Sequence, residues 1–70
     1  QNCSNEQLLN DAAQEVREHT AEVREREAEL SEAERSGDAE DVRKRTAKLE
    51  EAVEELDASR QALQALEAAQ

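Results

Sequence analysis

The amino-acid sequence predicts an all-α fold, an antiparallel two-helix coiled-coil hairpin. Bulky aliphatic residues recur every seven positions on both sides of Gly37, the only glycine of the 70-residue chain. A seven-residue repeat is typical of a helix that packs one seam against a partner helix. The residue numbers of the pairs taken across the glycine all add up to 72, so folding the chain back at residue 36 aligns the two seams. The eight seam residues are Leu9, Val16, Val23, Leu30, Val42, Leu49, Leu56 and Leu63.

The first helix is expected over residues 5–35. Ser4 and Gln7 have the spacing of a capping box, in which each side chain bonds to the other residue's backbone N–H at the start of a helix. No glycine or proline interrupts the segment that follows. Arg35 stands at the expected carboxyl end, where a positive charge complements the helix dipole.

The expected turn is 36–37, and the second helix is expected over residues 38–68. Gly37 can adopt the left-handed conformation that ends a helix, and Asp38 is a favourable N-cap for the next one. Glu40 and Asp41 add negative charge to that first turn, which again suits the dipole. Together the two helices form one domain over residues 4–69, without a linker.

The alternate layers between the helices are predicted to be small near the turn and polar farther away. Extending the heptads places Ala12, His19, Arg26 and Ala33 opposite Arg60, Val53, Thr46 and Ala39, respectively. In this arrangement Val53 joins the seam and packs against His19. Flanking charges support this alignment, because it brings Glu27 to Arg43 and Glu29 to Arg45, which are two pairs of opposite charge.

A lone two-helix rod of this length is marginally stable, because eight buried aliphatic side chains offset only part of the entropy of ordering the backbone. We therefore expect the hairpin to assemble into a larger helical bundle, with a second copy of itself or with another helical protein. The expected association surface adds apolar area at the end that holds both termini. It consists of Leu8, Ala52, Ala62, Leu66 and Ala69.

Composition argues against several classes of partner. The net charge of −10 disfavours nucleic acids and anionic membrane surfaces. No apolar run is long enough to span a bilayer, so a soluble protein is expected, with the cytoplasm favoured over secretion. Cys3 is the only cysteine and cannot form an intrachain disulfide. It is expected to be incidental, the alternative being a link between two copies in an oxidising compartment.

No catalytic site, cofactor site, metal site or small-molecule substrate is predicted. His19 is the only histidine and has no cysteine near it in register, which disfavours a zinc site. The many carboxylates lie on exposed helix faces, whereas enzymes need concave sites that exclude water. The expected function is therefore a non-catalytic structural or protein–protein interaction module that self-associates.

Two alternatives stay open. Residues 32–41, centred on Gly37 and Asp38, resemble the hairpin tip of Gre-type transcript-cleavage factors. The resemblance implies a hairpin that enters the secondary channel of RNA polymerase and offers tip carboxylates, here Asp38 and Asp41, to the active-site magnesium. The Asn-Ala-Glu-Tyr stretch that the family has after its Gly-Asp pair is replaced here by Asp41-Val42-Arg43-Lys44. The other alternative is a rod segment excised from a longer filamentous or surface protein.

Overall fold

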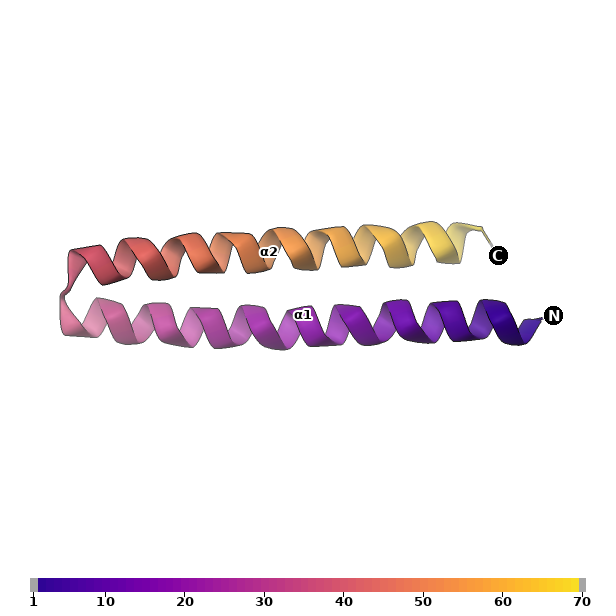
Figure 1. Cartoon of the computed structure of the whole chain (residues 1–70), viewed down its shortest axis with the longest axis horizontal. Coiled ribbons are helices and arrows are strands. Elements are labelled where there is room, and N and C mark those ends of the chain that lie inside the picture. Colours follow the sequence, from indigo (N-terminus) through magenta and orange to yellow (C-terminus); the bar gives the residue numbers. More distant parts are fainter. Residues whose placement is uncertain (1, 70) are drawn as a thin grey trace.

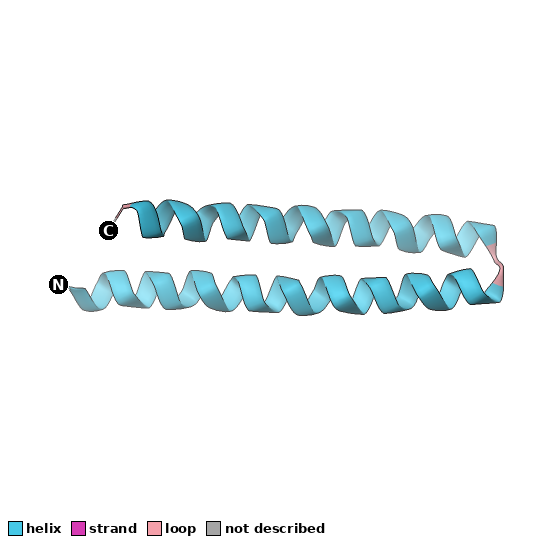
Figure 2. Cartoon of the chain, turned by 180° about the vertical axis from the view of Figure 1, so that it is seen from behind, coloured by secondary structure: helices cyan, strands magenta, loops and turns pink. Residues whose placement is uncertain are grey.

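The structure, a computed structural model, is a hairpin of two helices. It describes residues 2–69, and the side chains of residues 5–69. Helix α1 spans Asn2–Ser36 and helix α2 spans Ala39–Ala68. The helices lie side by side and antiparallel, with both termini at one end (Figure 1) and the turn at the other (Figure 2). The rod measures 55 × 14 × 11 Å. The predicted all-α hairpin is therefore confirmed.

Helix α1 begins at Asn2, three residues before the predicted start. Ser4 therefore lies inside the helix, so the predicted start at Asn5 is wrong. A cap contributes only about 1 kcal/mol, and nothing in residues 2–4 prevents the backbone from continuing a helix. The side chains of Cys3 and Ser4 lie outside those described, and so do the roles predicted for them.

The turn follows the predicted chemistry. Gly37 adopts a φ of +78° and its N–H donates to the carbonyl oxygens of Ala33 at 3.2 Å and Glu34 at 3.3 Å. Asp38 is the N-cap of α2, because its Oδ1 accepts from the backbone N–H of Glu40 at 3.1 Å and of Asp41 at 3.3 Å. A Cβ on Gly37 would meet nothing within 4 Å. Glycine is therefore needed for its backbone conformation and not for lack of space.

The core between the helices is thin. Among the described side chains, the buried apolar ones are Ala33, Ala52 and Leu56. Ser59 is also buried, and its hydroxyl donates to the carbonyl oxygen of Leu56 at 2.8 Å. The rest of the seam is only half-buried, namely Leu9, Val16, Val23, Leu30, Val42, Leu49 and Leu63.

The face that α2 turns toward α1 differs from the predicted one. The prediction placed Val53 in the seam and Ala52 on an outer surface, but Val53 is 39% exposed and Ala52 only 3%. Both predictions are wrong. Beside the aliphatic seam of α2, the positions that face α1 are those of Arg45, Ala52, Ser59 and Leu66. Of the predicted set, Ala39, Val53 and Arg60 are exposed and Thr46 is half-buried.

Side-chain size and charge explain this rotation of α2. Ala52 and Ser59 are small, so they let the backbone of α2 approach α1 closely. The predicted face would instead bring Arg60 to the interface, and burying an unpaired guanidinium is costly. The rotation keeps Arg45 close to α1 and carries Arg43 away from it. Accordingly Glu29 pairs with Arg45 at 3.2 Å as predicted, whereas Glu27 and Arg43 are both exposed and form no ion pair in the described part.

Candidate functional site

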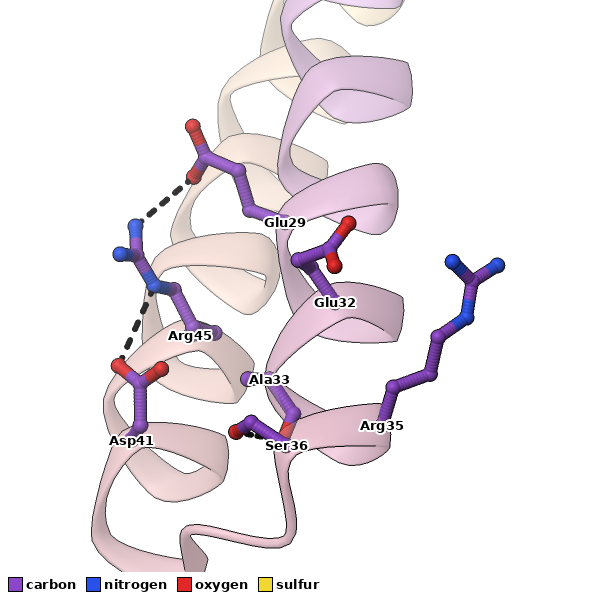
Figure 3. A pocket seen from close by; sticks show the side chains of 7 residues that line it. All are labelled: Glu29, Glu32, Ala33, Arg35, Ser36, Asp41 and Arg45. Carbon is purple, nitrogen blue, oxygen red and sulfur yellow. Dashed lines mark hydrogen bonds and ion pairs between the residues drawn. The ribbon is translucent and has the colours of Figure 1, made fainter.

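A group of charged side chains spans the two helices near the turn (Figure 3). The guanidinium of Arg45 donates through Nη1 to Oε1 of Glu29 at 3.2 Å, and its Nε lies 3.4 Å from Oδ1 of Asp41. These residues line an open recess with Glu32, Ala33, Arg35 and Ser36. Figure 3 shows Arg35 pointing away from the Glu29–Arg45 pair. The charged groups at the centre of the recess already pair with one another. They therefore help to align the two helices and are not free to bind a small molecule.

Arg26 extends this group along α1. Its Nη1 donates to Oε1 of Glu29 and its Nη2 to Oε1 of Glu25, both at 3.0 Å. The side chain is only 22% exposed, and its Nε is buried without a hydrogen-bond partner. An unpaired buried donor costs free energy because it loses its bond to water. The polar layer predicted at Arg26 therefore exists, and it weakens the interface there.

The two carboxylates of the acidic tip both have partners within the chain. Asp38 caps α2 and Asp41 lies beside Arg45. These contacts give both residues a structural role at the turn that does not require a metal ion. The tip role implied by the resemblance to Gre-type factors stays a prediction.

His19 of α1 lies beside two carboxylates halfway along the rod. Its Nδ1 is 3.8 Å from Oε1 of Glu55 on α2. One potential ligand atom from each of His19, Glu22 and Glu55 lies within 4.8 Å of the others. Imidazole nitrogen and carboxylate oxygen are both common ligands of divalent transition metals.

The predicted alignment does not bring this group together, because it places Val53 opposite His19. Glu55 follows Val53 by two residues and therefore points about 200° further around α2. The lack of a second histidine and of a nearby cysteine also disfavours zinc only when carboxylate ligands are left out. One available signal was Glu22, which follows His19 by three residues and so shares its face of α1.

The predicted association surface is only partly accessible in the hairpin. Leu8 is 51% exposed, Leu66 is half-buried, and Ala62 and Ala69 are exposed, whereas Ala52 is enclosed between the helices. The chain ends that contain Leu8 and Leu66 lie at the same end of the rod (Figure 1), which we call the open end.

A second exposed apolar site lies on α2. Val53 lines a surface groove together with Leu49, and Glu50 and Glu54 flank it. Leu8 and Val53 are the exposed large hydrophobic residues among the described side chains. Within residues 2–69, neither helix combines the length and apolarity that a membrane span requires.

One family model, described as a protein of unknown function (DUF1090), matches residues 1–58. The match includes all of α1, the turn and α2 as far as Ala58. Comparisons with curated proteins and with solved structures found no match.

Proposed function

The chain belongs to the DUF1090 family, and for this member we propose a non-catalytic role as a helical interaction module that associates with a second copy of itself. The observation that supports this role is the incomplete burial of the seam. Among the described side chains only Leu56 of the eight seam residues is buried, and the other seven remain partly accessible to solvent.

A second helical surface would bury more of the aliphatic seam and so add hydrophobic free energy. Fully burying a Val or Leu side chain contributes about 1.5–3 kcal/mol. The area that seven half-buried side chains still expose therefore represents several kcal/mol of hydrophobic free energy that the hairpin alone does not gain. This amount is large beside the net stability of an ordinary folded domain, which is roughly 5–15 kcal/mol. Packing a second hairpin against the first would convert the half-buried seam into the interior of a bundle.

The open end is the favoured contact region. Leu8 is the most exposed large hydrophobic residue described, and Ala62 and Ala69 are small enough for another helix to approach closely. The turn end is less suitable because Arg26, Glu29 and Arg45 form ion pairs there. A partner packed over those pairs would have to remove water from charged groups, which costs free energy.

Net charge opposes the association of two copies. Each chain has a formal charge of −10. Dissolved salt screens charges separated by more than about 10 Å at 0.1 M ionic strength. Assembly should therefore strengthen as salt is added, while the apolar contact itself changes little.

The test is the molar mass of the chain in solution, measured by sedimentation equilibrium with reductant present so that Cys3 cannot link two copies. We expect a mass above the 7.8 kDa of one chain that rises with protein concentration. Leu8→Glu should shift the mass toward that of one chain, because it places a charge in the contact region. Ala21→Glu is the matched control, since it adds the same charge at another exposed position of α1.

Circular dichroism of both variants shows whether the helices are kept. A parent chain that sediments as a monomer at every concentration and salt would refute self-association. Equal masses for Leu8→Glu and the parent oligomer would refute the open end as the contact region.

A further inference from the structure

We propose that His19, Glu22 and Glu55 form a binding site for a divalent transition-metal ion of the zinc class that links α1 to α2. The site joins an imidazole and a carboxylate of α1 to a carboxylate of α2. It departs from the sequence-based expectation of no metal, because only the fold brings Glu55 to His19.

The separations suit one ion. Zinc binds imidazole nitrogen and carboxylate oxygen at about 2.0–2.2 Å with tetrahedral geometry, which places neighbouring donor atoms roughly 3.4 Å apart. The Nδ1 of His19 and Oε1 of Glu55 are 3.8 Å apart, and the three candidate atoms all lie within 4.8 Å. The two glutamate side chains must therefore move closer to His19 before all three atoms can bond to one ion, with water as the fourth ligand.

Within the part of the chain that the structure describes, the two carboxylates have no competing cation. Among the described side chains, Glu22 has no hydrogen bond or ion pair, and Glu55 has only its contact with His19. Arg26 lies one turn after Glu22 on α1, but its two terminal nitrogens are already bonded to Glu25 and Glu29. A bound dication would neutralise two carboxylates in a chain whose net charge is −10.

The donor set selects the class of ion. Magnesium and calcium prefer sites built from oxygen alone, whereas imidazole with carboxylate suits zinc and its first-row neighbours. Because the ligands come from both helices, the site exists only in the folded hairpin. Binding should therefore stabilise the hairpin, by an amount that rises with the logarithm of the free zinc concentration once that concentration exceeds the dissociation constant.

The experiment uses the full chain with Cys3→Ser, so that the thiol does not bind zinc, and without an affinity tag. Zinc chloride is titrated into the protein, and binding is followed by calorimetry and by the NMR signals of the histidine ring. His19 is the only histidine of the chain, so those signals are unambiguous. We expect saturation at one ion per hairpin, a shift of the ring signals, and a higher melting temperature with zinc than with magnesium.

Glu55→Gln should weaken zinc binding by roughly tenfold or more, since loss even of a residue that only supports a metal ligand costs about 10–100-fold. Glu54→Gln is the matched control, because it removes the same charge from the neighbouring exposed position and should leave the affinity unchanged. Glu22→Gln and His19→Gln should each act like Glu55→Gln. Glu55 is half-exposed, so its replacement by glutamine is compatible with folding, which circular dichroism verifies.

Several results would overturn the site. They are equal affinities for Glu54→Gln and Glu55→Gln, unchanged histidine signals at saturating zinc, or magnesium acting as well as zinc. Repeating the sedimentation run with and without zinc separates this proposal from self-association, because the site is complete within one hairpin.

Discussion

The turn end and the middle of the rod hold the helices together by different means. Near the turn, Ala33 brings the helices close and charged groups surround the contact, with Glu29 paired to Arg45. In the middle of α2, Ala52, Leu56 and Ser59 form the continuous buried strip. Exposed ion pairs contribute about 0.2–1 kcal/mol each, whereas a buried leucine contributes about 1.5–3 kcal/mol. The ion pairs near the turn therefore favour one alignment of the helices, and the buried strip in the middle contributes more packing free energy than those pairs do.

The largest loss of stability is expected from a substitution in the middle of the rod. Leu56→Ala should lower the free energy of unfolding by about 2–5 kcal/mol, because it removes a side chain that is only 6% exposed and leaves a gap. Val53→Ala removes an aliphatic side chain three residues away that faces solvent, and it should cost far less. Thermal and urea melts followed by circular dichroism measure both. Equal losses would show that Val53 belongs to the seam after all.

A smaller loss of stability is expected from removing the N-cap of α2 at the turn. Asp38→Ala should destabilise the hairpin by about 0.5–2 kcal/mol, because the backbone N–H groups of Glu40 and Asp41 lose their acceptor. Asp38→Asn is the control, since its amide oxygen can accept the same bonds. A loss of stability in the asparagine variant as large as in the alanine variant would point to the charge of Asp38 as the cause.

A gain in stability is expected at Arg26. Arg26→Leu should stabilise the hairpin by about 1 kcal/mol. Removing a buried Nε without a partner and adding apolar area between the helices should outweigh the loss of the ion pairs with Glu25 and Glu29. The predicted alignment placed Arg60 between the helices as well, where the same substitution would add apolar area. Since Arg60 is exposed in the structure, Arg60→Leu should have little effect on the melting temperature. A stabilisation at Arg60 that matches the one at Arg26 would contradict the observed rotation of α2.

The smallest change in stability is expected from breaking the ion pairs beside the turn. Glu29→Gln should cost about 0.2–1 kcal/mol in low salt, because the Glu29 carboxylate accepts from both Arg26 and Arg45 at a partly exposed site. The difference from the parent should shrink in 0.5 M salt. Glu27→Gln makes the same change at an exposed residue without an ion pair and should be neutral. A salt-independent loss would indicate packing instead of charge.

The two helices, the turn and the axial alignment could be predicted from the sequence alone. Glycine occurs only at position 37, an N-cap residue follows it, and the heptads on either side are symmetric about the turn. These features act locally or repeat along the helix, so they can be read without knowing the packing. They also predicted the Glu29–Arg45 pair, which lies close to the turn, where the short connection leaves α2 little freedom.

Which flank of the α2 seam faces α1 depends on the packing of the two helices and could not be predicted. A heptad repeat specifies one row of aliphatic residues, and the row beside it can lie on either flank. The flank that contains Ala52 and Ser59 permits close approach, while the flank that contains Val53 and Arg60 would bury a charge. That choice moved Val53 outward, separated Glu27 from Arg43, and placed Glu55 beside His19. Since it depends on the fit of all layers together, no single residue of the sequence reveals it.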